Sequence, residues 1–409
     1  MLRGLAIALV FGVPLGAHAG GLSTPEPDAA ALGRAGTAMA LPDSASTVYY
    51  NPAGIALERG LGVQVGASLA DDRTRVQPAA DAAATSRAVA LAPSLFITQR
   101  LGDHYGVGLG VYRAMSQSLE YPSDFAGRFH VARADFGGTT LAPTVAARPA
   151  SWLSIGFGVT LTFGQAEVRQ AQGDASYETL QRATTHSFGI GASVGLWARL
   201  YRQYLQLGFS YRSSVDLDGR GRITSTPAGS STSLAVSDAR LSLPLPHQLA
   251  FALGSRPRVG TSVQLEARIA LLHDLRGFSY RDTEQPPSTL LAIPLRLRPG
   301  VQLRLGGEQR LLHDQLALRI GVGYDLGSAR RDLEPAFPDG DRVVVSAGIG
   351  YRRSEVAIDA GYLVSFSPSA AGSPSTTYAA TYDSVRHIVG LTLSVRVDTV
   401  GPRLARYPD

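Results

Sequence analysis

The sequence predicts an all-β fold, a transmembrane antiparallel β-barrel of about 14 strands. Past about residue 60 the chain divides into stretches in which apolar and polar residues alternate, and outer-membrane strands alternate in this way between lipid and an aqueous lumen. The connections between these stretches are alternately short and long. That asymmetry is typical of outer-membrane barrels, where tight turns face the periplasm and long loops face outside.

The connections can be assigned along the chain. The expected short turns are 100–103, 148–151, 199–203, 255–260, 309–314 and 352–355. The expected long loops are 75–86, 117–134, 170–182, 218–237, 276–294, 328–340 and 367–383. The sequence therefore places the barrel between residues 61 and 398, followed by a polar C-terminal tail, 399–409.

Composition excludes several classes of protein. Charged residues make up only 17% of the chain, against about a quarter in an average soluble domain. Beyond the N-terminus there is no run of roughly twenty apolar residues, so a helical membrane protein is excluded. The chain has no cysteine, which removes disulfides and thiolate metal sites. All basic side chains are arginines, and they are dispersed along the chain, so no patch suited to nucleic acid is expected.

The first residues have the form of a secretory signal peptide. Arg3 precedes an apolar run, 5–13, and Ala17-His18-Ala19 provides a small-residue cleavage site. We expect residues 1–19 to be removed and the mature chain to begin at Gly20. Export combined with a barrel pattern predicts a location in the bacterial outer membrane.

The alternation is clearest near the C-terminus. Leu316, Leu318 and Ile320 alternate with Ala317 and Arg319. A closed sheet of this many strands leaves a lumen too wide for side chains to fill. We therefore expect the apolar face to point to lipid and the lumen to hold water, a plug or a ligand.

The segment 20–60 lacks this alternation and is the right size for a plug inside a wide barrel. It contains a small-residue run, 29–40, with weak helical character, and then Asn51-Pro52-Ala53-Gly54, where Asn-Pro favours a turn. We predict that this segment forms an N-terminal hatch in the lumen.

Here the chain resembles a known family. The run Ala31-Leu32-Gly33-Arg34-Ala35-Gly36-Thr37-Ala38, then Asp43-Ser44-Ala45-Ser46-Thr47, then Asn51-Pro52-Ala53-Gly54, is similar to the N-terminal hatch of the FadL-like long-chain fatty acid transporters of the outer membrane. The stretches 318–324, 338–342 and 346–351 are similar to the late strands of that family and the loop that joins them. Family barrels have fourteen strands, in agreement with the count above.

The resemblance implies passive uptake of fatty acids or other hydrophobic small molecules. In the family, cargo is captured at extracellular loops, held in the lumen and released sideways through an opening at a kinked third strand, which the hatch contacts near its Asn-Pro-Ala triplet. The hatch and gating residues carried over to this chain are Gly33, Arg34, Gly36, Asn51, Pro52, Ala53 and Gly54.

The third strand, expected at 104–116, has a fault in its alternation. The phase of Val107, Leu109 and Val111 places Arg113 toward lipid, at a cost of about 2 to 4 kcal/mol at mid-depth. A kink permitted by interior glycines would turn Arg113 inward; alternatively, Arg113 lies at the extracellular rim and snorkels. The strand-kink candidates are Gly106, Gly108, Gly110 and Arg113.

Candidate ligand contacts are of two kinds. Polar residues in lumenal phase, Gln165, Arg212, Arg304 and Arg319, could bind an anionic head group, or could instead form a balanced lumenal network with carboxylates. Phe125 and Phe129, in a long loop, could form a capture groove or only pack that loop onto the rim.

The remaining expectations are negative or concern alternatives. No catalytic motif or metal-ligand spacing is present, so we expect no enzyme activity, no metal and no cofactor. The expected partners are a hydrophobic small molecule and the outer-membrane lipid and lipopolysaccharide, around a monomer. The competing functions are a general porin or hydrophilic-solute channel and an adhesion barrel that binds partners through its loops.

Overall fold

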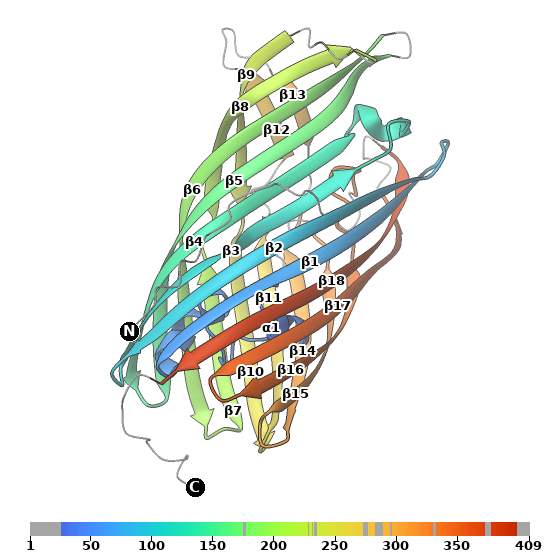
Figure 1. Ribbon diagram of the computed structural model, residues 1–409. Helices are drawn as coiled ribbons and strands as arrows, with labels where there is room; N and C mark the ends of the chain where they lie inside the picture. Colours follow the sequence, from blue (N-terminus) through green and yellow to red (C-terminus); the bar gives the residue numbers. More distant parts are fainter. Residues whose placement is uncertain are drawn as a thin grey trace, which may run out of the picture.

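The computed structural model describes residues 26–398 except 175–176, 228, 231, 233–234, 273–276, 283–288, 295–296, 330–332 and 373–377. The predicted signal peptide and C-terminal tail lie outside the described residues. The described strands form one closed antiparallel sheet (Figure 1). The sheet closes where Leu61 of the first strand pairs with Val397 of the last and Pro78 pairs with Ala380.

The barrel has fourteen strands, as predicted. Ten are continuous: β1 (Leu61–Pro78), β2 (Ala84–Leu101), β3 (Tyr105–Glu120), β4 (Arg133–Ala150), β5 (Leu153–Asp174), β6 (Tyr177–Tyr201), β15 (Leu316–Leu326), β16 (Arg342–Arg353), β17 (Val356–Ala371) and β18 (Ala380–Val397). The other four are each interrupted and consist of β7 (Leu205–Arg212) with β8 (Val215–Pro227), β9 (Ala235–Leu245) with β10 (His247–Arg258), β11 (Thr261–Leu271) with β12 (Gly277–Asp282), and β13 (Thr289–Pro294) with β14 (Gly300–Leu311).

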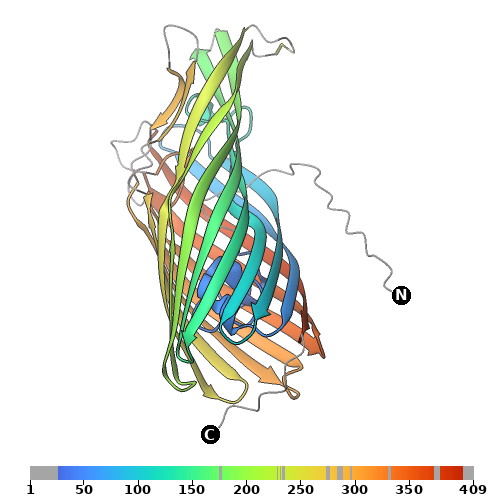
Figure 2. The same ribbon diagram turned by 90° about the vertical axis from the view of Figure 1, so that its left-hand side faces the viewer.

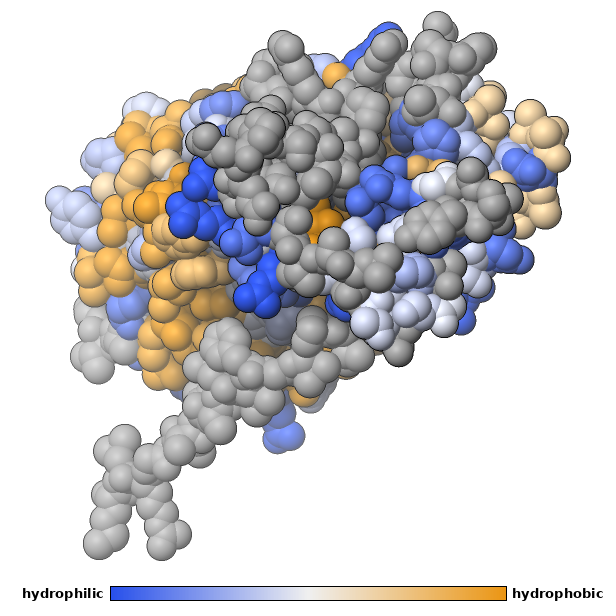
Figure 3. All heavy atoms as spheres, turned by 90° about the horizontal axis from the view of Figure 1, so that it is seen from above, coloured by the Kyte–Doolittle hydropathy of each residue, from blue (hydrophilic) through white to orange (hydrophobic). Residues whose placement is uncertain are grey.

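The apolar face of the sheet points outward. Leu69, Leu305, Ile320 and Leu391 are about half exposed or more, while their chain neighbours are buried or half-buried. Viewed from the extracellular end, hydrophobic side chains gather on the outer wall and hydrophilic ones around the mouth (Figure 3). This is the arrangement that a lipid-embedded barrel requires.

The short turns lie where they were predicted, but several predicted long loops are wrong. Strands β5 and β6 run on to Asp174 and Tyr177, where a loop at 170–182 was expected, and β1 and β2 also extend into their predicted loop. In the upper part of β5 the outward residues are polar, as at Glu167 and Arg169, while the inward Ala166 and Val168 are apolar and buried. The alternation is therefore reversed relative to the lipid-facing part of the strand, and the sequence pattern does not continue across the change. The β5, β6, β8 and β9 strands rise above the rest of the wall as a tall extension (Figure 1).

The described N-terminal residues lie inside the lower half of the barrel (Figures 1 and 2). They form two single-turn helices, α1 (Ala29–Leu32) and α2 (Thr47–Tyr50), and a 3₁₀ helix, η1 (Pro52–Leu57). Nearly all of residues 26–58, called the N-terminal segment below, are buried. Within the described ranges no helix is long and apolar enough to cross a membrane.

A hydrophobic cluster occupies the extracellular end of the barrel. The loop after β3, which contains the 3₁₀ helix η2 (Ala126–Phe129), contributes Tyr121 and Phe125, and the loop after β15 contributes Leu333 and Phe337. Gln117 and the Tyr121 hydroxyl donate hydrogen bonds to Ala336 O and Pro335 O, at 3.1 and 2.9 Å. The two loops are therefore packed against each other over the lumen.

Candidate functional site

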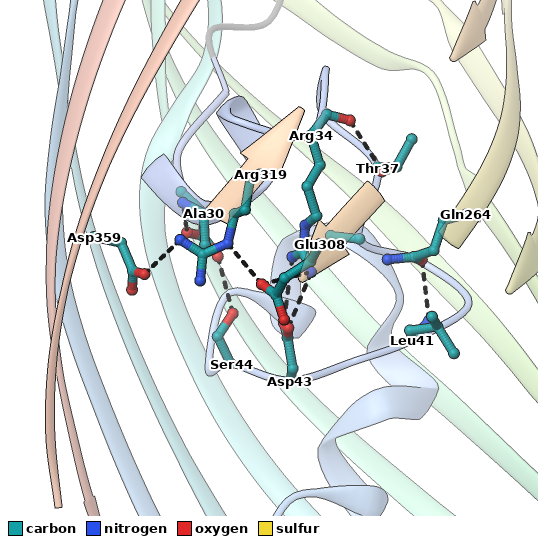
Figure 4. Close-up of polar contacts among 12 residues, drawn as sticks. Ala30, Arg34, Thr37, Leu41, Asp43, Ser44, Gln264, Glu308, Arg319 and Asp359 are labelled. Atoms are coloured by element: carbon teal, nitrogen blue, oxygen red, sulfur yellow. Dashed lines mark hydrogen bonds and ion pairs between the residues drawn. The ribbon is translucent and has the colours of Figure 1, made fainter. Parts of the chain in front are cut away.

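Buried ion pairs fix the N-terminal segment to the wall. Arg34 is only 1% exposed. Its Nη1 lies 3.0 Å from Oδ2 of Asp43 in the same segment and 3.6 Å from Oε2 of Glu308 on β14 (Figure 4). Glu308 in turn accepts from Arg319 Nε at 2.6 Å, and Arg319 Nη1 lies 2.7 Å from Asp359. Such a buried network is sensitive to the loss of any one member, because the remaining charges are left unpaired.

The charges in this network also set the protonation of Asp43. Burial alone would raise the pKa of the Asp43 carboxyl, but the guanidinium groups of Arg34 and Arg310 outweigh burial and hold that pKa well below its usual range. The pKa of Arg34 lies above its usual value despite burial, because Asp43 and Glu308 favour its charged form. Both side chains are therefore charged at neutral pH.

Inward-facing glycines of the wall make room for this segment. A Cβ on Gly33 would lie 2.8 Å from the Cα of Gly348 on β16, and one on Gly208 would lie 2.9 Å from Met39 Cγ. Gly36 has φ +89°, a conformation that glycine adopts without strain. Further inward glycines that lie against the segment are Gly106, Gly108, Gly156, Gly195, Gly254, Gly306, Gly321, Gly361 and Gly390. The segment and the wall thus approach at backbone distance.

The Asn51-Pro52-Ala53-Gly54 turn is held by β5 and β6. Asn51 caps η1, since its Oδ1 accepts from Ala53 N at 3.1 Å, and its Nδ2 donates to Leu196 O at 3.0 Å. Ser154 Oγ donates to Ala53 O at 2.7 Å. Gly54 packs against Pro42, whose Cβ is 2.7 Å from where a Gly54 Cβ would be. Asn51, Ala53 and Gly54 therefore each have a defined partner.

The wall is interrupted between β2 and β3. The two strands pair only from Leu95 with Val111 to Leu101 with Tyr105. Beyond that point the described residues 84–94 pair with β1, and residues 112–120 other than Ala114 pair with β4. The strands meet again where Glu120 N donates to Ser86 Oγ at 3.0 Å. This bounded gap is called the β2–β3 window below.

A register shift lies beside the window. In the β3–β4 pairing Arg113 faces Thr139 and Met115 faces Gly138, so Ala114 is the extra residue of a bulge. Because the shift follows Arg113, that residue keeps the outward phase of Val111 and is not turned into the lumen. Arg113 is half-buried, and its guanidinium lies against Gly137. The glycines Gly106, Gly108 and Gly110 lie before the shift, facing Ile55 and Val48 of the N-terminal segment.

Aromatic rings join the N-terminal segment to the lower edge of the window. Tyr112 packs edge-on against Tyr49, with ring centroids 4.9 Å apart, and is stacked with Phe96 of β2 at 5.9 Å. Contact with the third strand thus comes from Val48, Tyr49 and Ile55, which flank the Asn-Pro-Ala triplet; the triplet itself lies against β5 and β6.

A cavity of about 170 Å³ lies in the lumen beside Tyr49 and Tyr50. Its apolar lining includes Met39, Leu272 and Leu363. Its basic lining consists of Arg212, Arg268, Arg304, Arg342 and Arg386. Four carboxylates, those of Glu26, Glu266, Asp325 and Asp339, also line it, so the cavity combines apolar walls with a strongly charged part.

Four of these five arginines have carboxylate partners. Arg268 Nη1 lies 2.9 Å from Glu26, Arg342 Nη2 lies 3.1 Å from Asp339, and Arg304 and Arg386 pair with Asp325 and Asp72. Arg212 differs. Its Nη2 donates to Tyr49 O at 2.9 Å, its Nη1 donates to Gln248 at 3.1 Å, and its guanidinium lies 4.7 Å from the Tyr49 ring centroid. No carboxylate of the described chain pairs with it, and its Nε is buried without a partner.

The structure thus separates the predicted ligand contacts. Arg212 and Arg304 line the cavity, but Arg319 belongs to the ion-pair network under Arg34. The placement of Gln165 in the lumen is wrong, because Gln165 is exposed and shares the outward face with Phe163, while Gly164 and Ala166 are buried. Glycine and alanine occupy the inward positions here, so polarity alone gave the wrong phase.

The two predicted loop phenylalanines have different surroundings. Phe125 is 2% exposed and stacked with Tyr121 at a centroid distance of 4.3 Å. Phe129 is half-buried under the guanidinium of Arg128, 4.6 Å from the ring centroid. Phe125 therefore belongs to the extracellular cluster, and Phe129 lies at its margin.

Several residues of the site were not predicted. Trp197 Nε1 donates to Ala40 O at 2.9 Å, and Tyr50 donates to Glu26 at 2.7 Å. Tyr112 and Arg268 were also missed. The adjacent pair Tyr49-Tyr50, directly before the Asn-Pro turn, was the available signal, since two large aromatics in a small-residue segment need partners.

Comparison with known proteins agrees with this geometry. Residues 12–397 match the model of the outer membrane protein transport protein family (OMPP1/FadL/TodX). Outer membrane protein P1 of Haemophilus influenzae strain KW20/Rd is 23% identical over 401 residues, covering 85% of this chain and 86% of that protein. The 47 kDa outer membrane protein of Pasteurella multocida is 23% identical over 390 residues, covering 87% and 89%.

Solved structures share the fold. A FadL homologue from Pseudomonas aeruginosa superposes with a TM-score of 0.82 at 18% identity, covering 92% of this chain and 99% of that one. The toluene transporter TodX of P. putida gives a TM-score of 0.75 at 16% identity, covering 95% and 100%. The chain belongs to the OMPP1/FadL/TodX family of outer-membrane proteins, which transport hydrophobic small molecules.

Proposed function

We propose that this protein takes up a hydrophobic small molecule passively and releases it sideways through the β2–β3 window, with the N-terminal segment acting as a hatch. The observation that carries the proposal is the window itself, an interruption of backbone pairing whose lower edge, Tyr112, contacts the segment through Tyr49. Tyr49 also lines the lumenal cavity, so the cavity and the window share a wall.

A sideways exit suits an apolar cargo for a physical reason. Removing apolar surface from water lowers the free energy by about 25 cal/mol per Å². Transfer from a hydrated lumen to the lipid core is therefore favourable for a hydrophobic molecule. A route downward would have to pass the buried Arg34 network. The hatch therefore stays in place while cargo leaves through the wall.

Capture is assigned to the extracellular cluster. Tyr121 and Phe125 are buried in the apolar cluster of the extracellular loops, which would have to open for cargo to enter. Cargo bound among these side chains would be out of bulk water before it reaches the cavity. Fatty acids and neutral hydrocarbons, as in the toluene transporter TodX, both suit such a surface.

The window can be tested by removing its bulge. Deleting Ala114 brings Met115 into register with Gly138 directly after the Arg113–Thr139 pair and lets β3 continue beside β2. We expect uptake of a labelled hydrophobic substrate to fall to that of cells without the protein. Ala114→Ser, which keeps the bulge, should transport normally.

Folding must be checked in both variants by heat-modifiable mobility on gels. Full transport by a folded deletion variant would contradict lateral release. A porin would instead pass sugars freely, so rapid swelling of liposomes that contain the intact protein would contradict the hatch.

A further inference from the structure

We infer that the outward face of β1 and β2 carries a binding site for the phosphate groups of outer-leaflet lipid, formed by Arg73, Arg87 and Arg75. This site lies outside the lumen and does not depend on the transport route. Arg73 and Arg87 are directly opposite each other in the antiparallel pairing of the two strands. Their side chains are 52% and 62% exposed.

A single carboxylate holds the two guanidinium groups together. Arg73 Nη2 lies 2.9 Å from Asp71 Oδ2, and Arg87 Nε lies 3.2 Å from Asp71 Oδ1. Like charges directly opposite on two strands are normally unfavourable, and Asp71 offsets one charge of the pair. Arg87 Nη2 also donates to Asp71 Oδ2 at 3.3 Å. Within the described chain the other N–H groups of the two guanidiniums have no partner, and their planar geometry suits them to bind an oxyanion.

Arg75 adds a further positive charge to this face. It is the next outward residue of β1 and is exposed, opposite Thr85 and Asp383. No ion pair joins Arg75 to Asp383 in the described chain. Three arginines thus face two aspartates, of which one is already shared, and the surface has a net positive charge.

The position of these residues relative to the membrane selects a lipid as the partner. One outward residue below Asp71, Leu69 is 48% exposed and faces Leu91, which is 45% exposed. Asp71 is level with His387, whose Nδ1 is 2.8 Å from the Tyr362 hydroxyl, an aromatic pair of the kind found at the membrane interface. The arginines are therefore one step above the edge of the apolar belt, at the depth of lipid phosphates.

Arg87 belongs to the part of β2 that has no β3 neighbour. A phosphate bound to it would hold a lipid at the edge of the β2–β3 window. In the outer leaflet of this membrane the phosphate-bearing lipid is lipopolysaccharide, so the occupant is the bisphosphorylated lipid A portion.

The test compares purified wild type with Arg73→Ala/Arg87→Ala in detergent, with lipid A binding measured by native mass spectrometry. The matched control is Arg202→Ala/Arg258→Ala, which removes two exposed arginines at the opposite, periplasmic end. We expect the Arg73/Arg87 variant to bind bisphosphorylated lipid A about 30-fold more weakly, because each arginine near a lipid surface contributes roughly a factor of five. The control should bind like wild type.

Two further arms identify the ligand chemistry. Dephosphorylated lipid A should bind wild type as weakly as bisphosphorylated lipid A binds the variant, and inorganic phosphate should not compete. Arg73→Lys/Arg87→Lys should recover part of the affinity. Unchanged lipid A binding by the alanine variant, equal binding of dephosphorylated lipid A, or full competition by inorganic phosphate would each overturn the site.

Discussion

At the scale of single residues, the unusual member of the cavity is Arg212, whose guanidinium contacts a backbone carbonyl, an amide and a tyrosine ring but, among the described residues, no carboxylate. A cationic group held in a cavity without a counter-ion favours an anionic ligand. The same residue touches Tyr49, which leads to the window. We therefore propose Arg212 as a contact for an anionic head group, beside the proposed exit.

We predict that Arg212→Ala weakens binding of a long-chain carboxylate about 10- to 100-fold, since a hydrogen bond to a charged group contributes about 1.5 to 3 kcal/mol. Binding of a neutral hydrocarbon of similar length should change little. Tryptophan fluorescence titration of both ligands provides the measurement, with Arg202→Ala as the control. Equal losses for the two ligands would show that the substitution disturbs the cavity as a whole.

A second residue-scale prediction concerns acid. The folded state holds the pKa of Asp43 below its usual 3.8, so its stabilising contribution is complete above that pH and is lost as the pH falls below it. We expect the amides of residues 29–57 to lose protection against hydrogen exchange, measured relative to the intrinsic exchange rate at each pH, below about pH 3.8. In Asp43→Asn the protection of these amides should be lower at neutral pH and should change little as the pH falls below 3.8.

Glu58 gives a different profile. Burial raises the pKa of Glu58 above the usual 4.5, although the charge of Arg396 opposes this. The folded state therefore keeps Glu58 protonated to a higher pH than the unfolded state does, so the contribution of Glu58 to stability is lost as the pH rises above 4.5. The two carboxyls therefore act in separate pH ranges. A loss of protection that occurs only above pH 4.5 would assign the effect to Glu58 instead.

At the scale of the elements, the strands followed from alternation and the N-terminal segment from its absence, because both depend on local pattern. The interior details did not. The inward phase of β5 is carried by Ser154, Gly156, Gly164 and Ala166, small residues with no strong polarity, so Gln165 was assigned to the wrong face. Likewise, the glycines that were expected to bend the third strand instead leave space for Val48 and Ile55 of the N-terminal segment.

Adjacent glycines on β14 offer a controlled test of this fit. A Cβ on the inward Gly306 would lie 2.8 Å from Arg34 Cβ, whereas on Gly307 its nearest neighbour would be Ser262 O at 3.8 Å. We predict that Gly306→Val displaces the N-terminal segment and raises single-channel conductance in planar bilayers. Gly307→Val should conduct like wild type. Equal conductance of the two variants would show that the segment tolerates the added side chain.

At the scale of the whole molecule, the family, the fourteen strands and the outer-membrane location could be predicted, because they rest on repeated patterns and on a continuous motif. The β2–β3 window could not be predicted from this chain alone. The window depends on which strand each backbone group pairs with. The position of Arg113 indicated an irregularity in the third strand but did not show which face of the strand Arg113 lies on. The upper parts of β5 and β6 were missed because their outward face becomes polar while their inward face, with Ala166, Val168 and Ala183, is apolar, so the alternation changes phase there.

The proposed route predicts that the segment need not leave the barrel. Ala35 N lies 2.7 Å from Ser346 Oγ, so Ala35→Cys/Ser346→Cys should form a disulfide in a chain with no other cysteine. We expect oxidised and reduced forms to take up hydrophobic substrate at the same rate. Uptake that is restored only by a reductant would place the route through the segment, and single cysteine variants control for the substitutions.

The close seating of the N-terminal segment has a consequence for biogenesis. The segment joins β1 through Gly60, which lies against Val397 at the seam with β18, and it is surrounded by wall glycines on both halves of the sheet. The segment is packed too closely against the wall to enter the barrel after β18 has paired with β1. We therefore expect the segment to be in place before the β1–β18 seam closes, so that the strands assemble around it during insertion.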